Sequence, residues 1–160
     1  MTLVRRTNEY TVLREGPVVA LVCHERAPAE AFESLVSAFA HAPAGPLGLL
    51  VVSRPAAQLF SDESSRQRFG QILHALDERL ACVASVVRGT GFAAAIAHSA
   101  VTSLSMRERL ACRMELFGDL EQALSWMAVD LPNADVDGLY ERIENSRPAA
   151  PTPAPFAQLR

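Results

Sequence analysis

Two arginines and a glycine-rich turn are the residues of this sequence best placed to bind an anion. Arg54 follows one continuously apolar run, Arg88 follows another, and Gly89 and Gly91 come just after Arg88. If both runs are parallel strands, their carboxyl ends meet at one edge of a sheet, where open α/β proteins bind ligands. Glycines there expose backbone N–H groups to an anion, and they serve a tight turn equally well. The sequence therefore predicts an anion or partner contact at Arg54, Arg88, Gly89 and Gly91.

A second candidate is a phosphorylation site at Ser64 or Ser65, at the expected start of a helix. A phosphate group there would gain from the helix dipole, and Arg66 and Arg68 could pair with it. The alternative is a solvated first helical turn with Ser61 as the N-cap, because serine is favoured at such positions by capping alone.

The segment 133–144 matches the template of a calcium-binding EF-hand loop. Its oxygen ligands, its glycine at position 6 and its glutamate at position 12 are supplied by Asn133, Asp135, Asp137, Gly138 and Glu144. Apolar residues between Val136 and Ile143 recur at helical spacing, which competes with such a loop. We therefore expect a short docked helix there and no bound metal.

The remaining reactive side chains do not form a catalytic pattern. The histidines are scattered without acidic partners at ligand spacing, and His98 is expected to be packed and hydrogen-bonded; they are His24, His41, His74 and His98. Cys23, Cys82 and Cys112 stand among apolar neighbours, as buried reduced thiols do. The chain has no G-x-S-x-G motif, and all its cationic residues are arginine, which excludes a Schiff-base lysine. We predict neither an enzyme nor a cofactor.

Length and charge narrow the class of protein further. A chain of 160 residues can form one domain with a core of its own. The net charge of −3 gives no drive toward nucleic acid or an anionic membrane. The first residues lack the apolar core of a signal peptide, and no apolar run reaches the length of a membrane span. We expect a cytoplasmic protein that binds neither nucleic acid nor membranes.

Alternating apolar runs and amphipathic segments predict an α/β fold. Short apolar runs predict strands at 10–13, 18–23, 47–52, 82–87 and 114–117, the first two forming a hairpin. Apolar residues at helical spacing predict helices at 27–39, 61–80, 92–106, 120–128 and 136–143. The segment 92–106 carries no charge and is rich in alanine and serine, so we expect it to be deeply buried or partly covered by a partner.

This order of elements and the closing motif FGDLEQALSWM resemble the STAS domain of bacterial anti-sigma-factor antagonists, in particular its divergent myxobacterial form. Phe117, Asp119, Ala123 and Trp126 complete the pattern F-x-D-x-x-x-A-x-x-W, with Asp119 as the expected cap of the last long helix. The resemblance covers about 10–128 and implies a mixed sheet of about five strands with about four helices mainly on one face. The expected organisation is a STAS-like domain at 1–129, a short helical extension at 130–146 and a disordered Pro/Ala-rich tail at 147–160.

The resemblance implies a protein that binds partner proteins without chemistry of its own. Regulatory STAS domains are phosphorylated by a partner kinase on a serine in an Asp-Ser-Ser/Thr-Gly stretch; here the nearest equivalent, Asp62-Glu63-Ser64-Ser65, lacks the glycine. We predict an interaction module in bacterial regulation, with a kinase-like or other regulatory protein as partner and a contact surface at 61–69 and 88–99. A small-ligand or anion-binding domain using the strand carboxyl ends and a homo-oligomeric structural subunit, for example a homodimer, remain as alternatives.

Overall fold

The computed structural model describes residues 2–54, 57–60, 62–89 and 91–146. Within these ranges the strands are β1 (Thr2–Arg6), β2 (Tyr10–Glu15), β3 (Val18–Cys23), β4 (Leu47–Ser53), β5 (Leu80–Val87) and β6 (Arg113–Phe117). The helices are α1 (Ala29–Ala40), α2 (Glu63–Leu76), α3 (Phe92–Glu108), α4 (Leu120–Asp130) and α5 (Val136–Asn145). The α/β class expected from the sequence is confirmed.

The six strands form one mixed sheet in which spatial order follows chain order, β1 to β6. β1, β2 and β3 pair antiparallel, and β3, β4, β5 and β6 pair parallel. Both β3 and β4 are buried along their whole length, which is why they appear as continuous apolar runs in the sequence. The hairpin between β2 and β3 turns at Gly16, whose φ of 51° suits glycine.

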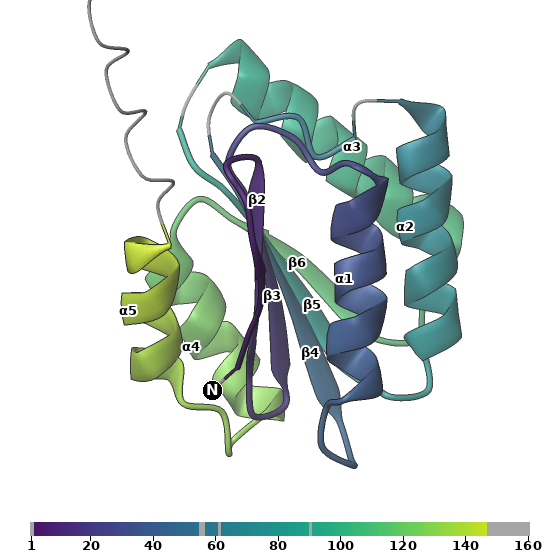
Figure 1. The fold of residues 1–160 in the computed structure, drawn as a ribbon. Helices are drawn as coiled ribbons and strands as arrows, with labels where there is room; N and C mark the ends of the chain where they lie inside the picture. The colour runs from purple at the N-terminus through teal and green to yellow at the C-terminus, as the bar shows by residue number, and fades with distance from the viewer. Residues whose placement is uncertain (1, 55–56, 61, 90, 147–160) are drawn as a thin grey trace, which may run out of the picture.

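The order of the strands explains where the helices lie. Connections between parallel strands are right-handed, so when each new strand adds on the same side, all crossover helices fall on one face of the sheet. These are α1, α2 and α3, and the opposite face is covered by α4 and α5 (Figure 1). The sheet is therefore buried between two apolar layers.

Three features of this architecture correct the sequence expectations. The sheet has a sixth strand, β1, whose side chains are mostly exposed and so leave no apolar run to detect. The helices lie on both faces, with α1, α2 and α3 on one, because α4 and α5 return across the face that the crossovers leave bare. α3 is not deeply buried, since Leu104 is the one buried residue among its described side chains. The expected tail at 147–160 lies outside the described residues.

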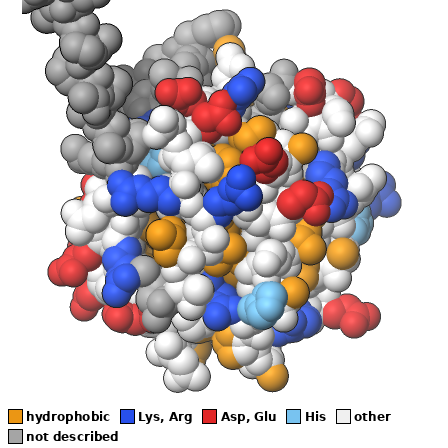
Figure 2. Space-filling view, viewed as in Figure 1, with side chains coloured by type: hydrophobic (Ala, Val, Ile, Leu, Met, Phe, Trp, Pro, Cys, Tyr) orange, Lys and Arg blue, Asp and Glu red, His pale blue; other side chains and the backbone are white. Residues whose placement is uncertain are grey.

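Helix α4 approaches the sheet closely because Gly48 on β4 has no side chain. A Cβ atom at Gly48 would lie 2.4 Å from Leu131 Cδ1 and 2.7 Å from Met127 Cε. α5 then packs on the same core through Leu139 and Ile143. On the face seen in Figure 2, arginine and acidic side chains are interspersed with apolar ones.

Candidate functional site

The carboxyl edge of the parallel strands was the predicted anion site, and the structure does bring Arg54 and Arg88 to this edge. The backbone N–H of Arg54 donates to the carbonyl of Cys23 at 3.2 Å, and that of Arg88 donates to the carbonyl of Ser53 at 3.2 Å. These bonds continue the ladder from β3 through β4 to β5. The two arginines are therefore neighbours across adjacent strands, as expected.

The side chain of Arg88 has a structural partner. Its guanidinium pairs with the carboxylate of Glu144 in α5, and both side chains are about one-third exposed or less. This ion pair joins the end of α5 to the end of β5. Gly89 and Gly91 have φ angles of 100° and 94°, so the turn into α3 needs glycine at both positions. Backbone geometry accounts for these glycines without a ligand.

The strand order also bears on a ligand at this edge. In open α/β sheets, ligands bind where the strand order reverses and neighbouring connections diverge to opposite faces. In the described sheet, β3 to β6 follow one another without reversal. Arg54 and Arg88 therefore do not flank such a point; the connections diverge at the next pair of strands, where α3 leaves β5 on one face and α4 leaves β6 on the other.

A buried pair that the sequence did not suggest lies beside this edge. The hydroxyl of Thr11 and Nε2 of His24 are 2.9 Å apart, and both residues are buried. Nδ1 of His24 has no hydrogen-bond partner. Burial, together with the positive charges of Arg54 and Arg6, lowers the pKa of His24 to about 4, so the imidazole is neutral at pH 7. A fully buried threonine cannot meet a substrate, so the pair is not a nucleophile with its base.

The cysteines are free thiols without activation. Cys23 and Cys82 are buried, as expected, while Cys112 is partly exposed. Burial raises the pKa of Cys23 and of Cys82 to about 12, and it also raises the pKa of Cys112. All three are therefore protonated at neutral pH, which disfavours nucleophilic or metal-ligand chemistry. The described residues contain no group of three or more metal-ligating side chains.

At the start of α2, the N-cap is Asp62 and not Ser61. Asp62 Oδ1 accepts the backbone N–H of Ser65 at 2.7 Å, and this bond lowers the pKa of Asp62. The cap differs from the expected one because α2 begins at Glu63, and the residue directly before a helix takes the capping position. Ser64 is exposed and Ser65 is partly buried in the first turn.

The arginines proposed to pair with a phosphoserine each have an acidic partner. Arg66 NH1 lies 3.3 Å from Glu63 Oε2, and Arg68 NH2 lies 2.8 Å from Glu33 Oε1 in α1. Arg107, in the last turn of α3, lies 3.0 Å from Glu63 Oε1. The start of α2 is thus joined to the end of α3 by an ion pair.

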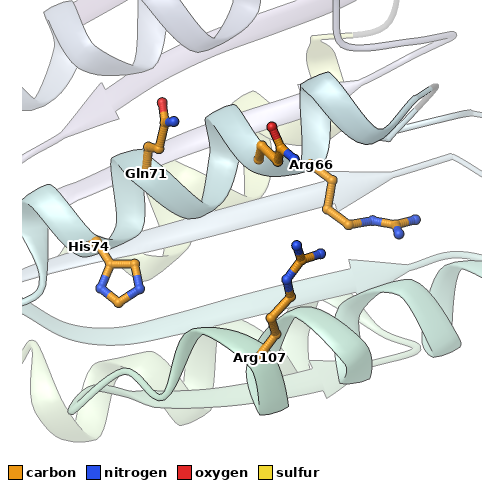
Figure 3. Close-up of a pocket in the computed structure, with 5 residues that line it drawn as sticks. Arg66, Gln71, His74 and Arg107 are labelled. Atoms are coloured by element: carbon orange, nitrogen blue, oxygen red, sulfur yellow. The ribbon is translucent and has the colours of Figure 1, made fainter.

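Between α2 and α3 lies an open cavity of about 260 Å³, lined by Arg66, Gln67, Gln71, His74 and Arg107. Figure 3 shows Arg66 reaching out from α2, Arg107 reaching up from α3, and His74 extending from α2 into the space between the helices. Sequence reasoning missed this site, because Arg107 and Glu63 are 44 residues apart and no local motif joins them. The only sequence signal is that Arg66, Gln67, Gln71 and His74 recur near helical spacing on α2.

The calcium loop predicted at 133–144 is not formed. α5 begins at Val136, so Asp137 and Glu144 lie in a helix and cannot wrap around an ion with Asn133. Asp135 Oδ1 instead accepts the N–H of Gly138 at 3.0 Å and caps α5. The helical spacing of the apolar residues prevails because Leu139 and Ile143 are buried against the core.

The outer surface of α3 is exposed although the helix is uncharged up to Met106. Ile96 is 54% exposed and Met106 is 76% exposed. His98, expected to be packed, is exposed as well. The helix thus presents apolar and small polar side chains to solvent.

Comparisons with known proteins add no assignment. No family model, no curated protein and no solved structure matches this chain. None of the helices in the described ranges combines the length and apolar character needed to cross a bilayer.

Proposed function

We propose that the chain is a non-catalytic protein-interaction module of STAS-like type, with a contact surface formed by the outer face of α3 and the start of α2. The observation that carries this proposal is the exposure of α3. This helix of 17 residues is uncharged through Met106, Ile96 and Met106 are exposed, and most of its described side chains are not buried in the core. Apolar side chains exposed in this way fit a protein partner.

A non-catalytic role is supported by the state of the reactive groups. The described thiols are protonated, and Thr11 and His24 are paired below the surface. A STAS-like fold is supported by the hairpin of β2 and β3 followed by helices and strands in alternation up to α4. We infer a regulatory protein as the partner, in keeping with that resemblance.

The alternative of an anion site at the strand carboxyl ends has weaker support. Arg88 pairs with Glu144, and the strand order of the described sheet lacks a reversal. A second copy of this chain is one form that the partner of α3 could take, and light scattering distinguishes it from a different protein.

The proposal is tested by capturing partners with three forms of the full chain: the native sequence, Met106→Asp and Val129→Asp. Met106 and Val129 are 76% and 74% exposed, and each lies in the last turn of its helix, α3 and α4, so they form a matched pair. A charge on the contact surface should abolish binding of the partner, while the same charge on α4 should leave it intact. If Met106→Asp retains every protein that the native chain retains, the proposed surface is wrong.

A further inference from the structure

The cavity between α2 and α3 has a lining that is unusual for a gap between two helices. The five described lining residues, Arg66, Gln67, Gln71, His74 and Arg107, all carry hydrogen-bond donors, and none of these five is acidic or aliphatic. Two helices that only pack together would bring apolar side chains to this position. The composition of the lining is that of a site for an anion.

Two arginines at the cavity share one carboxylate. Glu63 is shared, with Oε2 facing Arg66 at 3.3 Å and Oε1 facing Arg107 at 3.0 Å. One carboxylate therefore faces two guanidinium groups, which leaves one positive charge in excess among these three side chains. Gathering like charges costs free energy unless an anion compensates. Glu63 also holds both guanidinium groups beside the opening, so an incoming anion would find them in position.

One hydrogen-bond donor of a lining residue lacks an acceptor. Arg66 Nε is buried and makes no hydrogen bond, even though the end of the same guanidinium faces Glu63. Leaving a buried N–H without a partner costs free energy, and the cost is larger for a charged group. The guanidinium of Arg66 therefore has hydrogen-bonding capacity that Glu63 does not use.

The size of the cavity limits the ligand. A volume of about 260 Å³ lies below the range of about 300–1,000 Å³ that is typical for whole organic ligands. It suits a compact group with several acceptor oxygens. A phosphate group offers three such oxygens and is the anion that arginine binds best in forked geometry.

We propose that this cavity binds a phosphate group, and that the phosphate is carried by a phosphorylated side chain of the partner protein. The assignment of this source rests on the proposed function, because the cavity adjoins the contact surface at the start of α2. The assignment of the cavity as a phosphate site rests on its own charges and donors.

The site is tested by adding inorganic phosphate to the purified full chain and following the Arg66 Nε–H signal by NMR. We expect a saturable shift. Arg107→Gln should weaken the affinity about tenfold or more, since a hydrogen bond to a charged group is lost. Arg107 is 58% exposed, so this variant should fold. Arg68→Gln is the matched control, because Arg68 lies on α2 outside the cavity and should leave the affinity unchanged.

A variant that is expected to raise the phosphate affinity separates a binding role from a structural one. Glu63→Gln removes the competing carboxylate and should strengthen phosphate binding severalfold. The site is refuted if the Arg66 signal does not shift, if Glu63→Gln weakens binding, or if Arg68→Gln weakens it as much as Arg107→Gln does.

The source of the phosphate group is tested on the partner protein that the native chain captures. Phosphatase treatment of that partner should abolish its binding, and retention would show that the cavity serves free phosphate instead. The two proposals fail separately. A partner lost with Met106→Asp but no phosphate shift refutes only the phosphate site, whereas a phosphate shift with no such partner refutes only the interaction surface.

Discussion

Helices α3 and α4 both follow a strand of the parallel part of the sheet, yet they relate to the core in opposite ways. α4 has 11 residues and buries Leu120, Ala123, Leu124 and Met127. α3 has 17 residues, and Leu104 alone is buried among its described side chains. The N-cap of α4 is Asp119, whose side chain accepts a backbone hydrogen bond. The N-cap of α3 is Gly91, which has no side chain to do so.

The difference lies in the spacing of large apolar residues and not in mean hydropathy. In α4 they recur along one face, at i, i+4 and i+7 from Leu120, so one side of the helix fits the sheet. In α3 small and polar residues separate the large ones, so no continuous apolar face forms. A helix can therefore be uncharged and still leave its surface available for a partner.

The largest expected effect comes from truncating the core side of α4. Leu124→Ala should lower the free energy of unfolding by about 2–5 kcal/mol, because Leu124 is 1% exposed and its loss leaves a cavity. Ile96→Ala on α3 should change it by less than about 0.5 kcal/mol, as expected at an exposed site. Urea unfolding of both variants measures the difference. Equal losses would mean that α3 is packed as tightly as α4.

The second-largest expected effect is on the pH dependence of the free energy of unfolding, and it compares the buried His24 with a histidine on α3. His24 has a pKa lowered to about 4 from its usual 6.5, so as pH falls between these values the unfolded chain binds a proton that the folded chain does not. The free energy of unfolding should therefore fall with pH in this window, by up to about 3 kcal/mol from His24. His24→Gln should flatten this dependence in urea titrations between pH 7 and pH 4.

The matched control for this prediction is His98→Gln, because His98 is exposed on α3. It should keep the pH dependence of the native chain. A native-like slope for His24→Gln would contradict the neutral buried state of this imidazole.

The smallest effect concerns the start of α4. Asp119 Oδ1 accepts the N–H of Gln122 at 3.0 Å, and Asp119→Ala should lower the free energy of unfolding by about 1 kcal/mol. Asp119→Asn should retain most of this stability because asparagine caps about as well. Thermal and urea unfolding give the ranking. If alanine and asparagine have the same effect, the cap does not contribute.

Elements whose local pattern and packing agree could be predicted from the sequence. β3, β4 and β5 appear as apolar runs because they are buried on both faces, and the cap at Asp119 is set by its immediate neighbours. β1 escaped prediction because an edge strand with exposed side chains has no apolar signal. Deep burial of α3, one of the two expectations for this segment, was wrong because a helix without a continuous apolar face has little to bury.

The candidate sites depended on relations that a linear pattern does not contain. Arg54 and Arg88 were placed correctly at one edge because parallel strands align their ends, but the pairing of Arg88 with Glu144 depends on how α5 docks. Thr11 meets His24 through the antiparallel register of β2 and β3. The cavity beside Arg66 depends on the packing of α2 against α3, which no spacing within either helix specifies.

The two outermost strands have a consequence for self-association. β1 exposes Arg5 and Arg6, and β6 exposes Arg113 and Glu115. Charged side chains on border strands oppose the addition of a further strand from another molecule. Copies of this chain should therefore resist joining into extended ribbons or fibrils, even at high concentration, and any pairing of copies should proceed through helices.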